Sequence, residues 1–206
     1  MFVQYDLLMI ELTTALILFL FPLAYSPGPG NLFFAANGAR FGVRSTIPAT
    51  TGYHTATWLV TAAIGFGFAA VIHKYPGIFS TIKVLGSIYV LWLAWKLLRS
   101  GMVRTDQEPT VANFRDGVVL LVLNPKAYFI IAAMFAQFLT IESGNQIMLV
   151  LWISTIFTLN NLIAFTSWTV VGDRLATLFR SESNAKIMNL GFGSLLAVVA
   201  VWMFLS

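Results

Sequence analysis

Long runs of apolar residues, separated by short polar segments, dominate the 206-residue chain. Six of these runs approach the roughly 20 residues that an α-helix needs to cross a bilayer. They cover residues 7–25, 47–72, 78–98, 115–140, 146–171 and 185–206. The pattern predicts an all-α integral membrane protein with six transmembrane helices, forming a single transmembrane domain over residues 1–206.

Composition agrees with this class, because only 10% of the residues are charged, whereas soluble domains average about 25%. No Lys or Arg occurs among the first ten residues, so the first run is interpreted as a retained span and not as a signal peptide. The absence of cysteine excludes disulfide frameworks, thiolate metal sites and cysteine redox relays.

The basic residues predict an orientation in the membrane. The loops after the first, third and fifth runs hold nine of the twelve: Arg40, Arg44, Lys96, Arg99, Arg104, Arg115, Arg174, Arg180 and Lys186. Basic loops face the cytoplasm, so both termini are expected to face outward. Because the basic residues flank apolar runs and form no single patch, a lipid bilayer is the expected partner and nucleic acid is not.

The first run is followed by a break, in the stretch "SPGPGN". Proline interrupts a helix, and glycine permits unusual dihedrals and close approach. Irregular backbone at membrane depth occurs only where protein buries it or water reaches it. The freed backbone groups predict a substrate-binding wall; the alternative is a surface loop or a structural kink. The stretch comprises Ser26, Pro27, Gly28, Pro29, Gly30 and Asn31.

A second break is predicted in the fourth run, at "LNPKAY". Asn124 is a good helix cap and Pro125 a good first helical residue, so a half-helix is expected to start here. Its positive N-terminal end, together with Lys126, would suit a carboxylate. Lys126 lies eleven residues after Arg115, roughly 16 Å along a helix and near mid-membrane. The alternatives are that Lys126 snorkels or pairs with an acid such as Glu11.

The two halves of the chain show signs of an internal repeat. A lysine precedes Leu-Gly in the third and the sixth run, and a small polar residue precedes proline in the first and the fourth. Three spans per half would make residues 1–98 and 113–206 inverted repeats with broken helices 1 and 4, joined by a cytoplasmic loop over 99–114.

Other polar residues in the spans are candidates for binding or coupling. Asn160 and Asn161 are adjacent, so at most one is expected to face a site; ligand contact and interhelical hydrogen bonding are both open. His54 could relay protons or simply be hydrogen-bonded in place. Glu11 and Asp6 are further titratable groups, and none of these stands out. With two histidines in the chain, no metal site is expected.

Three stretches resemble a known family, the LysE/RhtB family of bacterial amino-acid exporters. They are "SPGPGNLFFAANGARFGVRSTIPATTGYHTA", "STIKVLGSIYVLWLAWKLLRSG" and "FRDGVVLLVLNPKAYFIIAAMFAQFL", and the resemblance covers about residues 6–205. It implies six spans, a bacterial cytoplasmic (inner) membrane location and export driven by the proton gradient. The family motifs map onto Pro27, Gly28, Pro29, Asn31, Asn124, Pro125 and Lys126.

The leading hypothesis is a secondary active exporter of amino acids or related small metabolites. Lys126 and the helix end after Pro125 would hold the carboxylate, and the groups at 27–30 with Asn31 would contact the amine or side chain. The lack of an acidic pair favours neutral amino acids. No cofactor is expected, and a homodimer is left open. The alternatives are a membrane channel or a lipid-handling protein; an enzyme is not favoured, because no catalytic pattern occurs.

Overall fold

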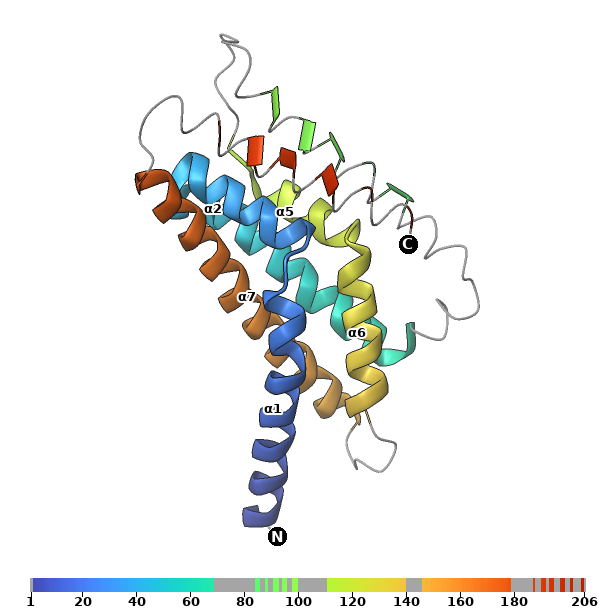
Figure 1. The fold of residues 1–206 in the computed structure, drawn as a ribbon. Helices are drawn as coiled ribbons and strands as arrows, with labels where there is room; N and C mark the ends of the chain where they lie inside the picture. The colour runs from blue at the N-terminus through green and yellow to red at the C-terminus, as the bar shows by residue number, and fades with distance from the viewer. Residues whose placement is uncertain are drawn as a thin grey trace.

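The computed structural model describes residues 2–68, 111–139 and 146–178, with isolated residues within 84–99 and 187–205. Most of these residues are helical and none of them forms a strand, as predicted (Figure 1). The elements are α1 (Phe2–Tyr25), α2 (Pro29–Ala63), the π-helical turn η1 (Ile64–Phe68), α5 (Phe114–Val122), α6 (Pro125–Phe138) and α7 (Gln146–Leu178).

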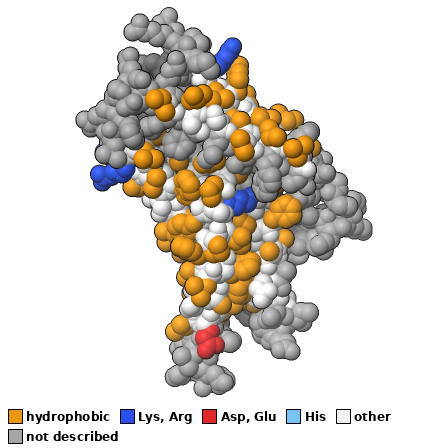
Figure 2. All heavy atoms as spheres, in the orientation of Figure 1, with side chains coloured by type: hydrophobic (Ala, Val, Ile, Leu, Met, Phe, Trp, Pro, Cys, Tyr) orange, Lys and Arg blue, Asp and Glu red, His pale blue; other side chains and the backbone are white. Residues whose placement is uncertain are grey.

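The helices pack around α2, which contacts α7 along one side and α5 along another, while α1 contacts α7 and α6 (Figure 1). Buried side chains form two clusters. One includes Phe34, Tyr53 and Phe165, and the other includes Leu20 and Phe157. Hydrophobic side chains cover most of the described surface in Figure 2, and charged ones are few, as expected for a surface that faces lipid.

Both predicted helix breaks are present. The chain bends by 64° between α1 and α2, and by 63° between α5 and α6. Each second helix begins with a proline, Pro29 or Pro125, as the loss of a backbone donor and the ring clash with the preceding turn dictate. The two bends are nearly equal in size.

The described residues contain one helix that is long and apolar enough to span a membrane, within 146–176, and three spans if each bent pair counts as one. The predicted third and sixth runs are described only at isolated positions, where Gly193 lies against the side chain of Leu98. The count of six spans therefore stays a prediction.

One predicted loop is wrong. Residues 40–44 were expected to form a cytoplasmic loop, but α2 continues from Pro29 to Ala63 through this segment. The helix changes direction at a single residue, Gly42, whose φ of 80° and ψ of 164° are non-helical. Glycine adopts a positive φ without steric cost, so one residue replaces a loop.

The contact between α2 and α5 depends on glycine. A Cβ atom at Gly117 would collide with the carbonyl oxygen of Ala49, and one at Gly52 with that of Phe114. Small residues allow helix backbones to approach closely in membranes. The start of α5 is fixed by Asn113, which accepts from two backbone amides, and by Asp116, which accepts from the Asn113 amide.

Candidate functional site

The carbonyl groups freed at the end of α1 are bound by side chains. The hydroxyl of Ser26 donates to the Leu23 carbonyl at 3.0 Å. Nδ2 of Asn31, on the first turn of α2, donates to the Ala24 carbonyl at 2.9 Å. Nearby side chains thus supply hydrogen bonds to part of the backbone at the break. A carbonyl buried in protein needs such a donor.

Two more distant side chains bind the next carbonyls. Nε1 of Trp168, in α7, donates to the Tyr25 carbonyl at 3.2 Å. Nζ of Lys126, in α6, donates to both the carbonyl and the hydroxyl of Ser26, each at 2.9 Å. The negative end of α1 favours a cation in this position. Lys126 therefore connects the second helix break directly to the first.

Lys126 has no carboxylate partner in the described residues. Glu11 is exposed and lies in α1 about four helical turns before the break. The alternative in which Glu11 pairs with Lys126 is therefore wrong. An ammonium group has three donors, and two of those on Lys126 are engaged by Ser26. The third donor has no acceptor among the described residues.

Asn124 occupies the N-cap position of α6, as predicted, but its side chain makes no capping hydrogen bond. Its Nδ2 instead donates to the hydroxyl oxygen of Tyr53, in α2, at 3.1 Å. Its Oδ1 is buried and has no hydrogen-bond partner among the described residues. The N-terminal amides of α6 are therefore left without a side-chain cap, which is the arrangement that favours a bound anion.

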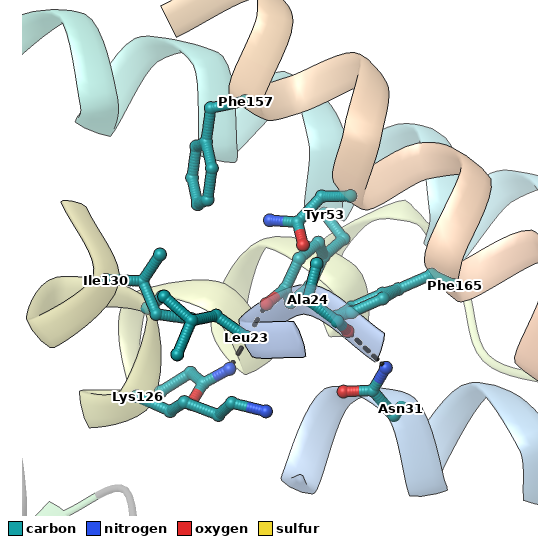
Figure 3. Close-up of a pocket in the computed structure, with 11 residues that line it drawn as sticks. Leu23, Ala24, Asn31, Tyr53, Lys126, Ile130, Phe157 and Phe165 are labelled. Carbon is teal, nitrogen blue, oxygen red and sulfur yellow. Dashed lines mark hydrogen bonds between the residues drawn. The ribbon is translucent and has the colours of Figure 1, made fainter. Parts of the chain in front are cut away.

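A pocket lies between the two breaks, and Figure 3 shows most of its lining. The cavity volume is about 20 Å³, which is room for one or two waters. The lining comes from α1, α2, the break at 124, α6 and α7: Leu23, Ala24, Asn31, Tyr53, Asn124, Lys126, Ala127, Ile130, Phe157, Asn161 and Phe165.

The lining divides into two chemical regions. Lys126 and Asn31 lie together near the breaks, whereas Phe157, Ile130 and Leu23 supply apolar groups further from Asn31 (Figure 3). The polar region offers one ammonium and several amide groups, and the apolar region offers aromatic and branched side chains. This arrangement suits a small zwitterion with an apolar side chain.

The two adjacent asparagines differ in position, as their helical spacing predicts. Asn161 lines the pocket, and Asn160 is buried outside the lining. His54 is also buried outside the lining, with Nδ1 2.7 Å from the Thr50 carbonyl oxygen. The structure therefore gives His54 a local hydrogen bond. The side chain of Asp6 lies outside the described residues.

Of the residues predicted at the first break, one lines the pocket and the others do not. Asn31 lines the pocket, and Ser26 contacts it through Lys126. Pro27 is exposed. Gly28, Pro29, Gly30 and Pro125 are buried beside the pocket without lining it, and a Cβ atom at Gly30 would lie 2.7 Å from the Phe165 ring.

Sequence reasoning missed the aromatic part of the site. Phe157 and Phe165 stand four residues before and after Asn161, so the three lie on one stripe of α7. That spacing around a polar residue was a signal available in the sequence. Tyr53 had no such signal, because its role depends on a contact with a residue 71 positions away.

Comparison with known proteins gives matches along most of the chain. A leucine efflux protein from Enterobacter sp. (strain 638) is 31% identical over 125 residues, 58% of this chain and 59% of the relative. A homoserine/homoserine lactone efflux protein from Salmonella typhimurium is 23% identical over 185 residues, 86% of this chain and 88% of the relative. An uncharacterized membrane protein from Vibrio cholerae is 27% identical over 177 residues, 82% of this chain and 85% of the relative.

The chain aligns with less than two thirds of the length of the first two relatives, both leucine efflux proteins, at 59% and 58%. No solved structure matches. The model of the LysE type translocators matches residues 21–206, which include both helix breaks and every pocket residue. The chain therefore belongs to the LysE type translocator family.

Proposed function

We propose that the protein is a secondary active exporter of neutral amino acids or related small metabolites across the bacterial cytoplasmic membrane. The observation that carries the proposal is the pocket between the two helix breaks, in which one lysine and several amides face an apolar region. Transporters commonly place substrate between discontinuous helices whose ends supply partial charges.

Each part of a zwitterion has a matching group. The carboxylate would bind the Lys126 ammonium and the uncapped N-terminus of α6. The substrate ammonium would donate to amide oxygens of the lining, with Asn31, Asn124 and Asn161 as candidates. The side chain would contact Phe157 and Ile130.

Two features favour neutral substrates. Among the described residues, the pocket lining contains no Asp or Glu, so it offers no carboxylate to a basic side chain. The family relatives are named as a leucine efflux protein and a homoserine/homoserine lactone efflux protein, and both names refer to uncharged side chains. The same names support outward transport and not catalysis.

The wider architecture remains part of the proposal. The near-equal bends of 64° and 63° support two inverted repeats with one broken helix each. Six spans, outward-facing termini and proton-gradient drive complete the mechanism, in which the two halves rock around a central site. The coupling group is not assigned, because Glu11 and His54 both lie outside the pocket lining.

Transport by reconstituted protein tests the proposal. Vesicles containing the purified chain are loaded with labelled leucine or homoserine, and a proton gradient is imposed. If the protein is an exporter, we expect saturable efflux that depends on the proton gradient. Efflux that rises linearly with concentration would indicate a channel instead, and no movement of any amino acid in a broad panel would contradict the proposal.

The matched variants Lys126→Ala and Arg44→Ala test the binding mode. Each removes one positive charge, but Arg44 is exposed and outside the pocket lining. Loss of a hydrogen bond to a charged group costs about 1.5–3 kcal/mol, so substrate affinity should fall roughly 10- to 150-fold for Lys126→Ala. Arg44→Ala should retain wild-type affinity. Unchanged affinity in Lys126→Ala would contradict the carboxylate site.

A further inference from the structure

The ammonium of Lys126 is held at the first helix break in this structure. Nζ donates to the carbonyl and the hydroxyl of Ser26, both at 2.9 Å. The side chain lies directly over Gly28, where an added Cβ atom would be 3.1 Å from both Cδ and Nζ. Glycine at this position leaves the space in which the lysine lies across the break.

The pocket in this arrangement is too small for an amino acid. Its volume of about 20 Å³ holds one or two waters, whereas a carboxylate group alone has three heavy atoms. A substrate must therefore displace part of the lining as it binds. The Lys126 side chain is the flexible member of the polar region, since its stem has four carbons and its donors rotate.

We propose that the substrate carboxylate displaces Ser26 as the acceptor of the Lys126 ammonium. The ammonium would then bind Ser26 when no substrate is present and the carboxylate when substrate is bound. The inference rests on the proposed function, since it concerns the same site. A hydrogen bond between two ionised groups is stronger than one from an ammonium to a neutral carbonyl or hydroxyl. The substrate carboxylate is therefore the preferred acceptor of the Lys126 ammonium.

The exchange would couple binding to movement. Lys126 belongs to α6, and Ser26 belongs to the break between α1 and α2, so their contact ties the two broken helices together. When the carboxylate takes the ammonium, the end of α1 loses its cationic partner. The two breaks are then free to separate, which alternating access by rocking halves requires.

Substitutions of Ser26 test the competition because they should move affinity in opposite directions. Ser26→Ala removes one of the two competing acceptors, so the Kd for leucine should fall about two- to ten-fold. Ser26→Asp places a tethered carboxylate beside the ammonium, so the Kd should rise ten-fold or more. Ser167→Ala is the matched control: its hydroxyl donates to the Ile163 carbonyl on the exposed side of α7, and its Kd should match wild type.

Binding is measured by titration calorimetry on purified protein, with homoserine as a second probe, and thermal unfolding shows that each variant is folded. A purely structural role for Ser26 predicts equal or weaker binding by Ser26→Ala, and that result would overturn the proposal. Tight binding by folded Ser26→Asp would do the same. Failure of the wild-type chain to bind either probe would instead count against the proposed function, on which this inference depends.

Discussion

Tyr53 and Asn124 are joined through their side chains by a hydrogen bond of 3.1 Å, although 71 positions separate them in the sequence. Both side chains are buried, at 1% and 4% exposure. The bond ties the link between α5 and α6 to the C-terminal half of α2. It also fixes the Asn124 amide at the edge of the pocket, so a residue of another helix contacts the second break.

Tyr53→Phe should therefore destabilise the protein and weaken transport. The substitution leaves Nδ2 of Asn124 buried without its acceptor, in addition to Oδ1, which already lacks a donor among the described residues. An unsatisfied buried group costs about 1–3 kcal/mol. We expect a loss of that size in the free energy of unfolding in detergent, with a lower rate of leucine efflux from vesicles.

Tyr128→Phe provides the control, since it removes a hydroxyl that donates to the Val122 carbonyl at 3.0 Å outside the pocket lining. It should lose less stability than Tyr53→Phe and keep the wild-type substrate affinity. Equal effects of the two substitutions on affinity would show that the Tyr53 contact has no special role at the site.

The sequence predicted those features that depend on local chemistry. Pro125 begins a helix as predicted, because proline lacks the donor that a continuing helix needs. Pro29 also begins a helix, although the sequence identified it only as part of the first break. Lys126 was identified because a lysine near mid-membrane is costly, and Asn31 because it belongs to the first break. Their meeting at one pocket followed only from the fold.

Features that depend on long-range contacts were not predictable from one sequence. Trp168 was given no role, yet it donates to the Tyr25 carbonyl, 143 positions away. Arg40 and Arg44 were assigned to a loop, yet Gly42 between them is a kink within α2. A glycine is compatible with either a turn or a kink, so the single sequence does not decide between the two.

Gly117→Ala should destabilise the contact between α5 and α2. The added Cβ atom would collide with the Ala49 carbonyl oxygen and lie 2.7 Å from the Tyr53 amide nitrogen, so the helices must separate. Overpacking of this kind costs about 1–3 kcal/mol, measured as a lower thermal midpoint. Gly191→Ala is the control, since a Cβ atom there meets no described residue within 4 Å. Equal midpoints for the two variants would contradict the close packing.

Asn161→Ala and Asn160→Ala form a pair of neighbours with different surroundings. Asn161 lines the pocket and is a candidate acceptor for the substrate ammonium, so its loss should raise the KM for leucine efflux about 10- to 150-fold, the worth of one hydrogen bond to a charged group. Asn160 is buried outside the lining, and its Nδ2 has no partner among the described residues. Replacing it should leave the KM unchanged. The reverse pattern would place the substrate on the other face of α7.

Phe157→Leu should change the size of the side chain that the pocket accepts. Phe157 is fully buried in α7 and lines the apolar region together with Ile130. One methylene in an apolar pocket is worth about 1–3 kcal/mol of discrimination. Exchanging the ring for the smaller leucine should therefore raise efflux of phenylalanine relative to leucine by about ten-fold or more, measured as the ratio of their kcat/KM values in vesicles.

Phe33→Leu separates this effect from general loss of packing. Phe33 is also buried, at 6% exposure, but it belongs to the other cluster and does not line the pocket. The same substitution there should lower stability through the lost apolar contacts and leave the ratio of phenylalanine to leucine efflux at the wild-type value. If both variants shift the ratio equally, selectivity depends on the rigidity of the whole bundle, and the apolar region beside Phe157 does not receive the substrate side chain.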